Sequence, residues 1–182
     1  MKTLVCLGDS LTWGFTLRGR DDFETPYPNF LNIPGFQILR RAQNGAKVSV
    51  FSSLIDDECR NASVFVILGG TNNIGLYKKT VSSTLTQMKN LLLFIRNNTN
   101  ASKFIILEVP PGQFFDDYNV VVEQLNSAYR GFASCQDDVE FVTWFKEIGA
   151  NFVSDNVHFD GETYRKLGCY LSEVLVPFLP TD

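Results

Sequence analysis

Apolar and polar positions follow one another in blocks along the chain, and the block that organises the rest is Thr3–Gly14, TLVCLGDSLTWG. Its apolar run, Leu4–Leu7, ends at the turn residues Gly8 and Asp9, and Ser10 comes directly after them. Short apolar runs that are closed by a turn are typical of buried strands in a parallel sheet. We therefore expect Ser10 at the carboxyl end of the first strand, the edge at which open α/β sheets bind ligands.

The blocks that follow alternate between two patterns. Short apolar runs that stop at glycine, proline or polar turn residues predict further strands over 36–41, 64–68, 104–109 and 139–144. Apolar residues at helical spacing predict helices over 48–59, 80–97 and 118–135, and a last helix from a cap at Asp160 to about Leu175. This alternation predicts a three-layer α/β/α sandwich on a parallel five-stranded sheet. Right-handed crossovers favour the flavodoxin-like strand order 2-1-3-4-5.

Composition narrows the class of protein. The chain has 182 residues, which predicts a single domain over 1–182, and its net charge of -4 argues against a nucleic-acid groove or a basic membrane-binding face. The apolar run after Thr3 is too short for a membrane span and lacks a signal-peptide cleavage site, so we expect a cytoplasmic protein. The four cysteines form no C-x-x-C pair and there is one histidine, which favours free thiols over disulfides or zinc: Cys6, Cys59, Cys135 and Cys169.

The expected strand order brings the loops after the first three strands to one rim, and these loops carry Ser10, Gly45 and Asn72. Gly45 has no side chain to obstruct its backbone N–H, and the side-chain amide of Asn72 has two donor hydrogens. With the Ser10 N–H, they predict three donors that converge where a carbonyl oxygen would become an oxyanion.

A serine hydroxyl needs a base before it can attack, and His158 is the only histidine of the chain. It lies in a long connection, 145–159, and Asp155 precedes it by three residues. On one turn the Asp155 carboxylate can reach Nδ1 and leave Nε2 free to face Ser10. Asp160 is an alternative partner for the imidazole, although its position before 161–163 suits a helix cap better.

Four segments taken together resemble a known family. GDSLTWG at 8–14, Asn44-Gly45, GGTNN at 69–73 and DNVH at 155–158 are similar, in this order, to the four signature blocks of the SGNH, or GDSL, hydrolases. The form of the first block looks most like bacterial arylesterases and acetyl esterases. The resemblance implies Ser10 as nucleophile, Asp155 and His158 as the rest of a triad, and no cofactor or metal.

By the same resemblance, Gly45 and Asn72 complete the oxyanion hole with Ser10. The chain departs from the family pattern in two places. Asn73 stands where the third block usually has aspartate, and Asn44-Gly45 lacks the fuller glycine pattern of the second block.

Aromatic residues gather in the loops of the same rim. We expect five of them to form an apolar wall that binds the acyl or aryl group of a substrate: Trp13, Phe15, Tyr77, Phe114 and Trp144. The alternative is that several of them only cover the sheet. No inserted lid is evident, so the site is expected to be open and shallow.

These features predict a serine ester hydrolase that cleaves small acyl or aryl esters, or acetylated carbohydrates, through an acyl-enzyme. A lysophospholipase or thioesterase of the same family is an alternative, as is an acyl-binding module without turnover. A nucleotide binder is disfavoured because no glycine-rich phosphate loop follows the first strand. Singly, Ser10 and Asn72 could be helix caps and Gly45 a turn residue. A monomer and a homodimer are both compatible with the acidic composition.

Overall fold

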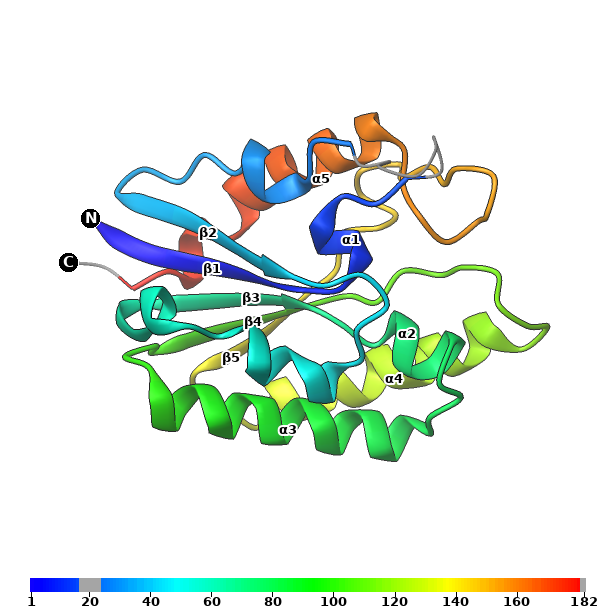
Figure 1. Cartoon of the computed structure of the whole chain (residues 1–182), viewed down its shortest axis with the longest axis horizontal. Coiled ribbons are helices and arrows are strands. Elements are labelled where there is room, and N and C mark those ends of the chain that lie inside the picture. Colours follow the sequence, from blue (N-terminus) through cyan, green and yellow to red (C-terminus); the bar gives the residue numbers. More distant parts are fainter. Residues whose placement is uncertain (17–23, 181–182) are drawn as a thin grey trace.

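The computed structural model describes residues 1–16 and 24–180, and its centre is a parallel sheet. The strand order is β2-β1-β3-β4-β5 (Figure 1), as predicted. The strands are β1 (Lys2–Gly8), β2 (Phe36–Ala42), β3 (Val64–Leu68), β4 (Lys103–Leu107) and β5 (Val139–Val142). In the ladders Gly8 pairs with Ala42 on one side and with Leu68 on the other, so the loops after β1, β2 and β3 leave the sheet at one edge.

Helices cover both faces of this sheet (Figure 1). On one face lie α3 (Val81–Asn98) and α4 (Tyr118–Ala133), and on the other lies α5 (Gly161–Val174). Two short helices follow strands at the carboxyl edge, α1 (Ser10–Trp13) and α2 (Thr71–Gly75). The 3-10 helices are η1 (Tyr27–Phe30), η2 (Val48–Leu54), η3 (Asp57–Asn61) and η4 (Val176–Phe178). The three-layer α/β/α architecture predicted from the pattern is confirmed.

Two apolar cores form because successive strand side chains point to opposite faces of the sheet. In β1, Val5 and Leu7 pack with the side chains of α3 and α4, whereas Leu4 and Cys6 pack with those of α5. All four side chains are fully buried. A strand buried on both faces must be apolar throughout, which is the feature that made β1 recognisable in the sequence.

The helix predicted over 48–59 is wrong in type. The segment forms two 3-10 helices, η2 and η3, separated by extended backbone at Ile55 and Asp56. Val48, Phe51 and Leu54 are three residues apart, which suits the three residues per turn of a 3-10 helix better than the 3.6 of an α-helix. Val48 and Phe51 are fully buried.

Two of the long helices, α3 and α5, begin at a side-chain cap, and the cap of α5 at Asp160 was predicted from the sequence. Thr80 accepts a hydrogen bond from the Ser83 amide at 3.1 Å, and Asp160 accepts one from the Thr163 amide at 2.8 Å. Because Asp160 caps α5, its carboxylate is not the partner of the imidazole. No helix of the described ranges has the length and apolar character needed to cross a bilayer.

Candidate active site

The turn after β1 holds Ser10 in place. A side chain at Gly8 would clash, since a Cβ atom there would lie 2.7 Å from the carbonyl oxygen of Leu68. Asp9 caps α1 by accepting a hydrogen bond from the Leu11 amide at 3.0 Å. Ser10 is thus the first residue of α1 and not its cap, and only 5% of its surface is exposed. The close packing at Gly8 and the cap at Asp9 together fix the backbone position of Ser10.

Ser10 and His158, which are 148 positions apart in the sequence, lie within hydrogen-bond distance of each other. The Nε2 atom of His158 lies 2.9 Å from Ser10 Oγ, and its Nδ1 atom lies 2.5 Å from Asp155 Oδ2. The other oxygen of Asp155 accepts the backbone amides of Val157 and His158, each at 2.9 Å. The ring of Phe15 packs against the imidazole with the ring centroids 4.5 Å apart. The structure therefore brings together the three side chains that the sequence singled out as a triad.

The carboxylate of this row is held in its charged form. Partial burial raises the pKa of Asp155, but the hydrogen bonds from His158 and from two backbone amides lower it more, so the pKa lies below its ordinary value of 3.8. Both oxygens of Asp155 have donors, which fixes the plane of the carboxylate as well as its charge. An ionised, oriented carboxylate at Nδ1 can hold an imidazole in the tautomer that leaves Nε2 free to accept a proton.

Asn72 and Gly45 are held near each other because hydrogen bonds join residues 72 and 77 to the loop after β2. Asn72 Nδ2 donates to the carbonyl oxygen of Ala46 at 3.0 Å, and the Tyr77 hydroxyl donates to the carbonyl oxygen of Gly45 at 3.3 Å. Gly45 has a φ of 72°, in the left-handed region that favours glycine. Among the hydrogen bonds of the described residues, none uses the Gly45 amide hydrogen. One hydrogen of Asn72 and the Gly45 N–H thus remain available as donors.

Asn73, the departure from the family pattern, is a structural residue here. It is fully buried, and its Oδ1 accepts the Val48 amide at 2.9 Å while its Nδ2 donates to Gln87 Oε1 at 2.8 Å. A neutral carboxamide with Gln87 as partner satisfies these groups without a buried charge. Asn73 therefore ties α2 to η2 and α3, and keeps the neighbouring Asn72 in position.

Four of the five aromatic residues expected at the rim have exposed or partly exposed side chains. Trp13 is 37% exposed with the Arg40 guanidinium 4.8 Å from its ring, and Tyr77 is 47% exposed. Phe15 lies against His158, and Phe114 lines a cavity that also contacts Asp155. These four residues remain candidates for contact with a substrate.

Trp144 is the exception, and the prediction that it lines the site is corrected. Its side chain is fully buried in the core under α5, its Nε1 donates to the carbonyl oxygen of Glu108 at 2.8 Å, and its ring packs on Phe145 and Phe159. A side chain with no accessible surface cannot contact a ligand. The β5 strand ends at Val142, so Trp144 already belongs to the connection that folds back over the sheet.

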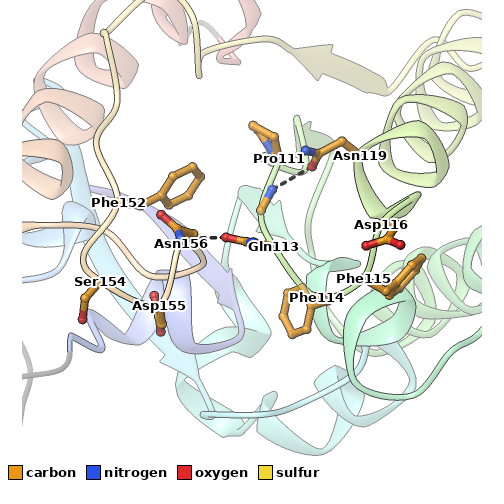
Figure 2. Close-up of a pocket in the computed structure, with 11 residues that line it drawn as sticks. Pro111, Gln113, Phe114, Phe115, Asp116, Asn119, Phe152, Ser154, Asp155 and Asn156 are labelled. Carbon is orange, nitrogen blue, oxygen red and sulfur yellow. Dashed lines mark hydrogen bonds between the residues drawn. The ribbon is translucent and has the colours of Figure 1, made fainter.

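A cavity of about 870 Å³ opens beside the Asp155 carboxylate (Figure 2). One wall is the loop between β4 and α4, with Gln113 and Phe114, and the other is the turn that carries Asp155 and Asn156. Sequence reasoning quoted Asn156 as part of the fourth block but gave it no role, and it passed over Gln113. The only available signal for Gln113 was its position just after the prolines that end the fourth strand.

Asp9 has a second property that the sequence did not reveal. Its side chain is fully buried, and burial raises its pKa to about 7 although the Leu11 amide lowers it. Its Oδ2 atom is one of the buried oxygens without a hydrogen-bond partner among the described residues. A carboxyl group that is costly to ionise thus lies directly before the serine.

Over the same described residues, no cluster of three or more histidine, cysteine or acidic side chains could hold a metal ion.

The fold and the row of hydroxyl, imidazole and carboxylate are typical of hydrolases that work through a serine. The sequence profile of the GDSL-like Lipase/Acylhydrolase family matches residues 6–166. The chain belongs to this family, as the four blocks indicated, and is a hydrolase of carboxylic esters.

Solved structures of the same fold include esterases. An aryl esterase from M. smegmatis superimposes with a TM-score of 0.78 at 19% identity, covering 98% of this chain and 100% of that one. A carbohydrate acetylesterase family member from Sinorhizobium meliloti has a TM-score of 0.77 at 21% identity, covering 98% and 99%. A carbohydrate esterase family 3 protein from Talaromyces cellulolyticus has a TM-score of 0.68 at 14% identity, covering 97% of each chain. No curated protein sequence gives a significant match.

Proposed function

We propose that this protein hydrolyses small acyl or aryl esters, including acetylated carbohydrates, through an acyl-enzyme formed on Ser10. The observation that carries the proposal is the continuous row from Asp155 Oδ2 through the His158 imidazole to Ser10 Oγ, with separations of 2.5 Å and 2.9 Å. A binding module would gain nothing from a base at hydrogen-bond distance from a serine hydroxyl.

The proposed reaction has two halves. In the first, His158 Nε2 takes the Ser10 proton while Oγ attacks the ester carbonyl, and the N–H groups of Ser10, Gly45 and Asn72 bind the oxyanion. Collapse of this intermediate breaks the bond to the alcohol, which leaves with the proton from His158. In the second half, His158 takes a proton from water, the hydroxide attacks the acyl carbonyl, and the proton returns to Ser10 Oγ as the acid is released.

The substrate class follows from the open rim and from the names of the structural relatives. Trp13 and Tyr77 have exposed aromatic side chains, in the segments that follow Ser10 and Asn72. These side chains are suited to contact with a short acyl or aryl group. One of the similar structures is an aryl esterase and another a carbohydrate acetylesterase family member, which supports an aryl or acetyl ester as the substrate. A lysophospholipase or a thioesterase would use the same triad and differ in the length of the acyl chain it accepts.

Hydrolysis of p-nitrophenyl acetate, butyrate and octanoate by the wild type and by Ser10→Ala tests the proposal. We expect loss of turnover in Ser10→Ala and unchanged turnover in the control Ser53→Ala, whose serine is exposed on η2. Mass spectrometry after treatment with an organophosphonate should find one adduct, on Ser10. Equal rates in the two variants would exclude Ser10 as the nucleophile. A wild type without turnover or adduct would leave the acyl-binding module as the better account. A rate that rises up to octanoate would favour a lysophospholipase or thioesterase.

We extend the proposal to a reducing compartment such as the cytoplasm. All four cysteines are free: Cys6 and Cys59 are buried, and Cys135 and Cys169 are exposed. Free exposed thiols are uncommon in oxidising compartments, where they form disulfides. Thiol titration of the protein isolated under native conditions should count four reactive groups after unfolding.

A further inference from the structure

The turn that carries the acid and the base of the triad is largely self-contained. The Val153 amide donates to the carbonyl oxygen of His158 at 2.8 Å, and the Asn156 amide donates to that of Val153 at 3.0 Å. Asn156 has a φ of 54°, a left-handed conformation that asparagine tolerates better than most residues. These bonds shape the turn, but they do not determine where it stands relative to Ser10.

Besides the hydrogen bond between His158 and Ser10, two hydrogen bonds to Gln113 connect this turn to another part of the molecule. The Gln113 amide donates to the carbonyl oxygen of Asn156 at 3.1 Å, and Asn156 Nδ2 donates to Gln113 Oε1 at 2.8 Å. Figure 2 shows the two carboxamides pointing toward one another across the cavity beside Asp155. Within residues 1–16 and 24–180, hydrogen bonds from positions 153–157 to other parts of the chain reach only Gln113 and His158.

Gln113 itself stands on a fixed support. The loop after β4 is tied to α4 because the Gly112 amide donates to Asn119 Oδ1 at 2.9 Å. On its other side Phe114 packs on α2 so closely that a Cβ atom at Gly75 would lie 2.7 Å from the ring. The same ring packs against Tyr118 with centroids 4.9 Å apart. The loop of Gln113 therefore touches α2, the helix that carries Asn72.

We propose that Gln113 and Asn156 are positioning residues, whose paired hydrogen bonds set the place of Asp155 and His158 relative to Ser10 and to the oxyanion donors of α2. Neither residue touches the reacting atoms. They act through the backbone of the turn, because Asn156 is one residue after Asp155 and two residues before His158. The inference rests on the proposed function, since it assigns a role within that same triad.

The first test removes the side-chain half of the connection. Gln113 and Asn156 are both exposed, so a truncation there leaves no buried unpaired group and we expect the fold to be retained. We expect Gln113→Ala to lower kcat for p-nitrophenyl acetate by about three- to tenfold, the equivalent of one ordinary hydrogen bond, with KM nearly unchanged. Gln113→Glu keeps an acceptor for Asn156 Nδ2 and should retain most of kcat. Gln124→Ala, an exposed glutamine on α4, is the matched control.

Asn156→Gly provides an independent second variant, since glycine accepts the left-handed backbone and removes only the carboxamide. If the two side chains act as a pair, the double variant Gln113→Ala/Asn156→Gly should lose no more activity than either single variant. Additive losses would mean that each residue acts separately.

A readout without turnover separates this inference from the proposed function. His158 is the only histidine, so its imidazole N–H resonances in an NMR spectrum are assigned without ambiguity. We expect the Nδ1–H signal to broaden or shift in Gln113→Ala and Asn156→Gly but not in Gln124→Ala. An unchanged signal together with wild-type kcat in both variants would overturn the inference. A wild type that turns over no ester would count against the proposed function alone, while the NMR comparison would still decide on the pairing.

Discussion

The side-chain nitrogen of Asn72 lies 3.0 Å from the carbonyl oxygen of Ala46, the residue directly after Gly45. One hydrogen of the amide is therefore used to hold the loop of Gly45, and the orientation of the second hydrogen is fixed by the first. Asn72 is 5% exposed, so this arrangement has little freedom to relax. Two donors that come from different loops are thus held as one unit before any substrate binds, which is the property that the proposed oxyanion hole requires.

Replacing Asn72 by alanine removes both hydrogens. We expect kcat for p-nitrophenyl acetate to fall by about 10²–10³, the usual effect of losing one oxyanion donor. KM should change little, because the donor binds charge that develops only in the transition state. Steady-state kinetics measure both quantities. A loss confined to KM would assign Asn72 to ground-state binding and contradict its role at the oxyanion.

Asn73 gives the matching prediction for stability. Asn73→Ala would leave the Val48 amide without its acceptor in a fully buried place, at a cost of about 1–3 kcal/mol in the free energy of unfolding. Asn73→Asp keeps an oxygen that accepts the Val48 amide. If the Gln87 side-chain amide turns over, its NH2 group can donate to the second oxygen, so we expect a smaller loss in the free energy of unfolding. Urea unfolding of both variants measures the difference. Equal losses would show that Gln87 cannot adapt to the family's usual residue.

The Asp155 carboxylate leads to a prediction about pH. Because the pKa of Asp155 is lowered, its carboxylate stays charged well into the acid range, and the stability it contributes is present at neutral pH and lost only as pH falls below about 3.8. Any loss of kcat/KM between about pH 8 and 5 therefore does not come from protonation of Asp155. We expect Asp155→Asn to lower kcat by up to about 10⁴ through misorientation of the imidazole. A wild-type kcat in Asp155→Asn would contradict this role of the carboxylate.

Much of this arrangement was predictable from the sequence because the deciding patterns are local. Apolar runs closed by turns located the strands, and the parallel order brought Ser10, Gly45 and Asn72 to one edge of the sheet. The spacing of Asp155 and His158 sufficed to predict their pairing, since a single turn brings the two side chains together. The single-domain extent over 1–182 stays a prediction.

The parts that could not be predicted depend on contacts between distant segments. Trp144 follows a strand as Trp13 does, and only the folding back of the connection after β5 buries it while Trp13 stays exposed. The 3-10 character of η2 depends on a spacing of three that also fits one face of an α-helix. The pairing of Gln113 with Asn156 joins loops 43 positions apart, and neither residue has a pattern of its own.

Burial of Asp9 leads to the last prediction. The pKa of this carboxyl is raised by burial to about 7 in the folded protein, against an ordinary value of 3.8 in the unfolded chain. The protonated form is therefore favoured by folding, so the contribution of Asp9 to stability is fully present below about pH 4 and is lost as pH rises toward 7, by about 1.4 kcal/mol per pH unit at most. Asn at this position is always neutral and keeps an oxygen to accept the Leu11 amide. We expect the free energy of unfolding of Asp9→Asn, relative to the wild type, to rise from pH 4 to pH 7 and to level off above it.

The exposed Asp137→Asn serves as the control, and its difference from the wild type should not follow this rise. If the wild type and Asp9→Asn instead keep a constant difference across the whole window, the carboxyl is ionised in the folded protein and its burial must be compensated by a donor to Oδ2.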